Sequence, residues 1–384
     1  MPGILLGERM FNQRLFRKLD YVLLLNILLI MGIGIVALSS AINVTSTGDY
    51  NGVIKQLLWI LVSFTAMLVV ALLDYEALGS FSFRWYAIII ILLIAVLFTR
   101  PINGASSWFN FGIVSFQPSE IAKIILIISL ARHIDNTMIK DELGMNKPKN
   151  LLLVAIHVGL PLLLILKQPD FGTAFVIFGI VLVMLFMSNI KYKYIGTFVF
   201  LGIVAVTLIW YFLMIQKNDL FFSHYQAERI RVLFDPAADP RGSGYNVLQA
   251  QMAIGSGQLY GMGLYKGTQT QLGNIPAKTT DFIFSVIGEE MGFVICAIVI
   301  VLYVLLLLRC AYIAYTAKDN YGRLVAVGVL TMIGIHVLVN IGMNIGIMPV
   351  TGIPLPFISY GGSSLLTNMM GIGLVLSVHS KSEK

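Results

Sequence analysis

Charge is scarce in this sequence. Only 12% of the 384 residues are Asp, Glu, Lys or Arg, whereas 58% are hydrophobic. Soluble domains contain about 25% charged residues. The composition therefore excludes an ordinary water-soluble protein and indicates a polytopic membrane protein. Its length does not require several domains, and we predict one all-α integral membrane domain over residues 1–384.

Cysteine and the common catalytic motifs are also scarce. Cys296 and Cys310 lie on one predicted helix, about 21 Å apart, which is too far for a disulfide. The sequence has no Gly-x-x-x-x-Gly-Lys-Ser/Thr loop for ATP. It has no Gly-x-Ser-x-Gly elbow, and its five histidines form no metal-ligand pattern. We therefore expect no ATP hydrolysis and no dedicated metal site.

Apolar runs dominate what is present. Most of them reach or approach the length of about 20 residues that a helix needs to cross a bilayer. We predict about ten transmembrane helices: Tyr21–Ala41, Val53–Leu73, Trp85–Thr99, Pro118–His133, Leu151–Leu166, Gly172–Ser188, Tyr194–Ile215, Phe282–Leu308, Leu324–Ile347 and Pro356–Val378.

The basic residues predict the orientation. Ten spans place both termini on one side, and the loops of that side hold most of the Lys and Arg. The opposite short loops hold little beyond Lys55, Arg100 and Lys167. The positive-inside rule then places both termini in the cytoplasm. The net charge of +7 matches contacts with anionic membrane lipids and requires no nucleic acid.

One long polar segment, residues 216–281, separates the predicted seventh and eighth spans and faces outside in this topology. It ends in Thr280-Asp281, directly before the apolar residues Phe282-Ile283-Phe284. We expect the Asp281 carboxylate to lie in a water-accessible mouth above an apolar floor. The alternative is a helix N-cap without further function.

Three more charged residues lie at the ends of predicted spans. Glu120 and Lys123 share one helix face because they are three residues apart, and Asp170 opens the sixth span. Ionisable groups at membrane depth usually face a cavity or each other. A buried Glu120–Lys123 ion pair and an Asp170 N-cap are the structural alternatives to a site. For Glu289 and Glu290, helix packing or a polar cluster is as plausible as function.

The last outer loop, residues 349–364, is rich in Pro and Gly. This composition predicts a kinked, re-entrant path. Irregular backbone at membrane depth is tolerated where protein buries it or where it lines a cavity. The loop is therefore either a structural plug or a wall of a groove for a lipid substrate.

At this point the sequence resembles a family, the SEDS proteins of shape, elongation, division and sporulation. The resemblance rests on Gly352-Ile-Pro-Leu-Pro-Phe-Ile-Ser-Tyr-Gly-Gly-Ser-Ser364, and further stretches agree in the same order along nearly the whole chain. They are Phe116-Gln-Pro-Ser-Glu-Ile-Ala-Lys123, Gln168-Pro-Asp-Phe-Gly-Thr-Ala174, Gly244–Gly257 and Thr280-Asp-Phe-Ile-Phe-Ser-Val-Ile-Gly-Glu-Glu290. Residues 340–352 most resemble the elongation branch, with the division and sporulation branches close.

The resemblance implies a peptidoglycan glycosyltransferase of the bacterial plasma membrane that serves cell-wall elongation and rod shape. Its substrate would be lipid II, an undecaprenyl-pyrophosphate disaccharide-pentapeptide, and its partner a class B penicillin-binding protein. The resemblance places the catalytic carboxylate at Asp281 and supporting polar residues at Glu120, Lys123 and Asp170, with a loop tryptophan at Trp108.

The sequence departs from the family pattern in two places. Ser107 stands where many relatives have Arg, and Ala277 and Thr279 stand where many have Glu and His. If the missing Arg or His helps to hold pyrophosphate, another group must replace it. Lys278, Arg229 and Arg231 are the nearest basic candidates.

The implied reaction inverts the donor sugar in one displacement and needs one general base, which a single carboxylate supplies. The pyrophosphate leaving group needs its charge neutralised more than it needs a proton. Lys123 is the first candidate for that role, followed by Arg229 and Arg231; a divalent cation, Mg²⁺ or Mn²⁺, is the alternative. A lipid II flippase and a non-catalytic scaffold are the competing functions.

Overall fold

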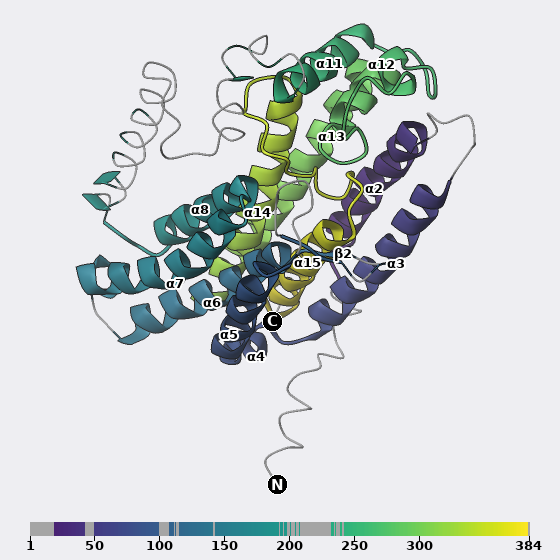
Figure 1. Cartoon of the computed structure of the whole chain (residues 1–384). Coiled ribbons are helices and arrows are strands. Elements are labelled where there is room, and N and C mark those ends of the chain that lie inside the picture. Colours follow the sequence, from purple (N-terminus) through teal and green to yellow (C-terminus); the bar gives the residue numbers. More distant parts are fainter. Residues whose placement is uncertain are drawn as a thin grey trace.

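The computed structural model describes residues 19–42, 50–99, 107–110, 112, 115–140, 143–191, 193–194, 196–197, 200, 204, 207, 232–233, 235, 239 and 242–382. This part of the chain is mainly helical, with one short hairpin (Figure 1). Its elements are α2 (Tyr21–Ile42), α3 (Asn51–Leu72), α4 (Tyr75–Ser80), α5 (Ser82–Val96), β1 (Phe109–Asn110), β2 (Ser115–Phe116), α6 (Pro118–Lys140), η2 (Gly144–Asn146), α7 (Pro148–Lys167), α8 (Phe171–Phe186), α11 (Ser243–Ser256), α12 (Thr268–Gln271), α13 (Ile283–Tyr315), α14 (Asn320–Asn344) and α15 (Gly362–Ser382).

Several of these helices have the composition of membrane spans. By length and apolar character, α2, α3, α7, α13 and α14 can each cross a bilayer, and α5 and α8 are shorter apolar helices. Helix α15 differs because most of its residues are buried, and it packs on α3, α6, α13 and α14. A helix covered by protein on all sides need not be strongly apolar, since its neighbours shield it from lipid.

Most predicted spans coincide with helices, with shifted ends. Helix α15 begins at Gly362 rather than Pro356, because the residues before it form the irregular loop. Helix α13 continues to Tyr315, beyond the predicted end at Leu308. The predicted span over 194–215 lies almost entirely outside the described residues. The number of spans and the side of the membrane on which each terminus lies therefore stay predictions.

The polar segment 216–281 contains helices of its own. Helices α11 and α12 pack on α13 at one end of the molecule, opposite α4 and the C-terminal end of α15 (Figure 1). Arg229 and Arg231 lie outside the described residues, so the structure does not place these two candidates.

A break in α13 fixes this segment to the helix bundle. Gly292 has a φ of 77°, and a Cβ atom there would lie 2.2 Å from the backbone nitrogen of Gly261. The backbone N–H of Phe293 donates to the carbonyl of Gln258 at 2.9 Å instead of continuing the helix. Gly288 and Gly292 therefore pack closely against α11 and the loop after it.

Glu289 and Glu290 complete this attachment. The Glu289 carboxylate accepts the backbone N–H groups of Gln269 and Thr270 at 2.6 and 2.9 Å. The Glu290 carboxylate accepts that of Gly267 at 3.3 Å. Both side chains are buried. The structure thus gives the two glutamates a packing role, in which they satisfy the N–H groups at the start of α12.

Charged groups also pair at the opposite end of the molecule. Lys381 of α15 lies 2.7 Å from the Asp74 carboxylate and 3.0 Å from that of Glu76. Arg309 of α13 contacts Asp20 at 2.5 Å. These pairs tie the end of α15 to α4, and α13 to the start of α2.

Candidate active site

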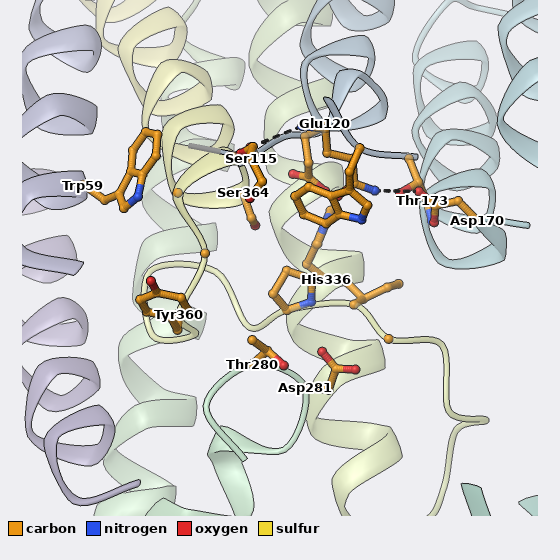
Figure 2. Close-up of a pocket in the computed structure, with 18 of the residues that line it drawn as sticks. Trp59, Ser115, Glu120, Asp170, Thr173, Thr280, Asp281, His336, Tyr360 and Ser364 are labelled. Carbon is orange, nitrogen blue, oxygen red and sulfur yellow. Dashed lines mark hydrogen bonds between the residues drawn. The ribbon is translucent and has the colours of Figure 1, made fainter. Parts of the chain in front are cut away.

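A cavity of about 690 Å³ lies where α3, α6, α8, α14 and the loop before α15 meet. Charged and polar side chains come to it from distant parts of the chain, as Figure 2 shows for Glu120, Asp170, Asp281 and His336. This volume lies in the range typical of ligand-binding pockets, about 300–1,000 Å³. The cavity is therefore the candidate active site.

Asp281 lies on the cavity wall, in the turn before α13. Phe282 occupies the cap position of α13 and makes no side-chain cap hydrogen bond, so the structure gives no support to the N-cap alternative for Asp281. Asn340 and Asn344 of α14 donate side-chain hydrogen bonds of 2.9 and 3.1 Å to the Asp281 carbonyl. These bonds fix the backbone from which the carboxylate extends, and Asp281 lines the cavity (Figure 2).

The loop before α15 forms a wall of the same cavity. Its Tyr360 N–H donates to the Thr279 carbonyl at 2.9 Å, and Ser359 Oγ donates to the Thr280 carbonyl at 2.6 Å. Gly352–Pro354 and Tyr360–Ser364 are among the lining residues. The loop is thus irregular backbone that lines a cavity and holds the Asp281 turn, as the groove-wall interpretation predicts.

Glu120, Lys123 and His336 form a hydrogen-bonded group beneath the cavity. The Lys123 ammonium donates to Glu120 Oε1 and to His336 Nε2, both at 2.9 Å. His336 Nδ1 lies 2.7 Å from the Met332 carbonyl. Because a carbonyl only accepts, Nδ1 carries the proton and Nε2 accepts from Lys123. The predicted buried Glu120–Lys123 pair is confirmed.

The three side chains differ in their access to the cavity. All three are buried, but Glu120 and His336 line the cavity and Lys123 does not. Glu120 Oε2 is buried and has no hydrogen-bond partner among the described residues. Sequence reasoning missed His336, although it lies on the face of α14 that carries Asn340 and Asn344, at successive spacings of four residues.

Asp170 caps a helix and also lies at the cavity. One carboxylate oxygen caps α8 by accepting the Thr173 N–H at 3.0 Å. The other accepts from Gln117 Nε2 and from Ser119 Oγ, each at 3.0 Å. Asp170 also lines the cavity. The N-cap is therefore confirmed, and the same side chain joins α8 to the start of α6 at the cavity wall.

Trp108 lines the cavity beside the β1–β2 hairpin. The preceding residue, Ser107, is buried and donates a hydrogen bond of 3.0 Å to the Gln168 carbonyl. The position at which the resemblance expects Arg therefore carries a small packed hydroxyl and no charge.

Two further lysines, Lys278 and Lys55, differ in whether they line the cavity. Lys278 donates to the Thr270 carbonyl at 2.7 Å, away from the lining residues. Burial lowers the pKa of Lys278, and Glu290 and Glu289 oppose that shift. Lys55 of α3, which sequence reasoning did not single out, lines the cavity directly.

Among the described residues, no group of three or more His, Cys, Asp or Glu side chains has the arrangement of a metal site.

Comparisons with known proteins agree with the sequence motifs. A profile of the family described as "Cell cycle protein", which covers FtsW, RodA and SpoVE, matches residues 20–384. Peptidoglycan glycosyltransferase MrdB of Escherichia coli K12 is 43% identical over 77% of this chain and 76% of its own. Peptidoglycan glycosyltransferase RodA of Treponema pallidum is 34% identical over 94% of this chain and 98% of its own.

Solved structures show the same fold. A structure described as "Structural coordination of polymerization and crosslinking by a peptidoglycan synthase complex" matches with a TM-score of 0.79 and 30% identity, over 95% of this chain and 99% of that one. The rod shape determining protein RodA of Thermus thermophilus matches with a TM-score of 0.70 and 29% identity, over 95% and 98% of the two chains. The chain therefore belongs to the FtsW/RodA/SpoVE family of multi-pass bacterial membrane proteins, the SEDS family, and is RodA-like within it.

Proposed function

We propose that this protein polymerises lipid II into glycan strands, with Asp281 as the general base. The observation that supports this most is the position of Asp281, a cavity-lining carboxylate on a backbone held by Asn340 and Asn344. Relatives named peptidoglycan glycosyltransferase support the reaction class. The related rod shape determining protein supports a role in cell-wall elongation.

The reaction is a single inverting displacement. Asp281 removes the proton from the 4-hydroxyl of the acceptor GlcNAc as that oxygen attacks the anomeric carbon of the donor MurNAc. The bond from this carbon to the pyrophosphate oxygen breaks, and undecaprenyl pyrophosphate leaves with the bonding electrons. The α-linked donor thus becomes a β-linked product. One carboxylate is sufficient because no covalent sugar–enzyme intermediate forms.

The remaining polar groups position the sugars and their leaving group. Glu120 lines the cavity with one carboxylate oxygen, Oε2, that has no partner among the described residues, and Lys123 holds the other oxygen. Asp170 and Trp108 line the wall that α8 and the hairpin form. Lys123 compensates the charge of Glu120, which reduces the repulsion between that carboxylate and an entering pyrophosphate. Arg229, Arg231 and a divalent cation, Mg²⁺ or Mn²⁺, stay candidates for direct contact with the pyrophosphate.

The partner that fits this activity is a class B penicillin-binding protein. The similar structure described as a peptidoglycan synthase complex coordinates polymerization and crosslinking. A glycan strand emerging at the mouth of the cavity needs a transpeptidase nearby to crosslink it.

The test uses the purified protein with lipid II, alone and with a class B penicillin-binding protein. Glycan polymer is resolved on a gel, with Asp281→Ala in parallel and with EDTA in one arm. We expect polymer from the wild type and none from the variant. Loss of polymer in EDTA, restored by Mg²⁺ or Mn²⁺, would establish the cation.

The alternatives predict different results. A flippase moves labelled lipid II across vesicle membranes without chain growth, so the absence of polymer with the partner bound would favour it. A scaffold predicts that Asp281→Ala fully complements loss of the gene in growing cells. Either outcome would contradict the proposed reaction.

A further inference from the structure

Helix α3 presents one continuous face to the cavity. Its lining residues are Lys55, Leu58, Trp59 and Val62. They are spaced at i, i+3, i+4 and i+7, which places them along one side of a helix. From Lys55 to Val62 this face extends about 10 Å. It begins with a cation near the first turn of α3 and continues with apolar side chains toward the helix centre.

Lys55 differs from the other cations near the site. Lys123 is bound to Glu120 and His336, and Lys278 is bound to the Thr270 carbonyl. Within the described part of the chain, no ion pair or hydrogen bond joins the Lys55 ammonium to another side chain. Lys55 is exposed on the cavity wall. Its charge is therefore available to an anion that enters the cavity.

The apolar part of this face is open to lipid as well as to the cavity. Leu58 and Val62 are 58% and 52% exposed although they line the cavity. Trp59 between them packs on the start of α15, where a Cβ atom at Gly362 would lie 2.2 Å from the indole (Figure 2). This contact anchors α3 to α15 and leaves Leu58 and Val62 as a path from the cavity toward the hydrocarbon.

We propose that Lys55 binds the diphosphate of the lipid-linked donor, and that Leu58 and Val62 guide its polyprenyl chain into the bilayer. The inference rests on the proposed function for the identity of the substrate. It supplies a cation to a chain that has Ser107 in place of the arginine that the family resemblance expects. A polyprenyl diphosphate has a charged head and an apolar tail. In this arrangement the head lies beside Lys55 and the tail lies along the next turns of α3.

The test measures binding without turnover. The purified full-length protein in detergent is titrated with undecaprenyl pyrophosphate and with undecaprenol, and tryptophan fluorescence reports binding because Trp59 and Trp108 line the cavity. We expect Lys55→Met to weaken pyrophosphate binding about tenfold, the scale of a lost charge-assisted hydrogen bond. Undecaprenol binding should not change, which also shows that the variant is folded. Lys55→Arg should retain the preference for the diphosphate.

Matched variants sharpen the assignment. Lys266→Met removes an exposed lysine that does not line the cavity, so it should leave both affinities unchanged. Val62→Asn should weaken undecaprenol and undecaprenyl pyrophosphate by similar factors. An unchanged diphosphate preference in Lys55→Met would overturn the proposal. So would displacement of the diphosphate from the wild type by an equal mole fraction of phosphatidylglycerol, which would make this a general phospholipid site.

The outcome is separable from that of the polymerisation test. If no polymer forms but the diphosphate preference depends on Lys55, the result supports the lipid site and contradicts the proposed reaction. If polymer forms while Lys55→Met keeps the wild-type preference, the result supports the proposed reaction and contradicts the role of Lys55.

Discussion

Two groups of charged residues in this protein differ in whether other residues of the protein pair with them. At the C-terminal end of α15, Lys381 contacts both Asp74 and Glu76, and Arg309 contacts Asp20. In the cavity, Glu120 uses one oxygen for Lys123 and leaves the other without a partner among the described residues. Lys55, which lines the same cavity, has no ion pair with a described residue.

The difference separates structural charges from those available to a ligand. A buried polar atom without a partner is costly, so it persists where a ligand or water satisfies it. Charge pairs that satisfy one another need no ligand, and they join helices. Completeness of pairing therefore distinguishes these helix-joining pairs from the cavity group.

The largest expected effect comes from Asp281→Asn. The amide keeps the size of the side chain but cannot act as a base, so turnover should fall by about 10²–10⁴-fold. The measurement is the initial rate of lipid II consumption by purified protein, with thermal unfolding as the check on folding. Turnover at the wild-type rate would remove Asp281 as the base and would weaken the distinction between the two groups of charges.

The next effect concerns the Glu120–Lys123 pair. Glu120→Gln leaves the Lys123 ammonium buried without its counter-charge, which should lower the stability of the fold by about 3–5 kcal/mol. The double variant Glu120→Gln/Lys123→Met removes both charges and should recover most of that loss. Thermal unfolding in detergent compares the two variants. A double variant no more stable than the single one would contradict the pair as described.

Asn340→Ala should act on the rate through the position of Asp281. The variant removes the hydrogen bonds of 2.9 and 2.7 Å to the Asp281 and Ile353 carbonyls. We expect kcat to fall about tenfold with little change in KM, because small displacements of a catalytic group reduce rate more than binding. Asn368→Ala is the control, since Asn368 bonds locally to Ser364 in α15. Equal losses in both variants would indicate a general packing effect.

The smallest effect is expected at the other end of the molecule. Lys381→Met removes partly exposed ion pairs, which contribute about 0.2–1 kcal/mol. Stability should fall by that amount, and polymerisation by the purified protein should be unchanged. A tenfold loss of polymerisation would show that the paired charges are coupled to the cavity, and the comparison above would fail.

Local patterns predicted much of the fold and part of the site. Apolar runs located the helices, and spacing by three residues paired Glu120 with Lys123. The Asp170 N-cap depended on its place directly before α8. Each of these features involves near neighbours in the chain, so helix geometry alone determines it. Ends of helices were less well predicted, as at Gly362, because long-range contacts decide where irregular backbone is stable.

Contacts between distant residues were not predictable in the same way. His336 joins Lys123 across 213 residues of sequence. Lys55 was counted only as a loop charge, and its place on the cavity wall depends on the packing of α3 against α15. The break at Gly292 and the N–H groups that Glu289 and Glu290 accept likewise depend on a loop inserted from residues 258–270.

The sequence by itself determined the class of protein, its family resemblance, the approximate spans and Asp281 as the proposed general base. Composition and motif order are properties of the chain, so they need no knowledge of packing. Only the tertiary structure decided which charges share one cavity and which satisfy each other. Helix packing sets the distances between residues far apart in sequence, and those distances determine whether an ionisable group is paired or open to a ligand.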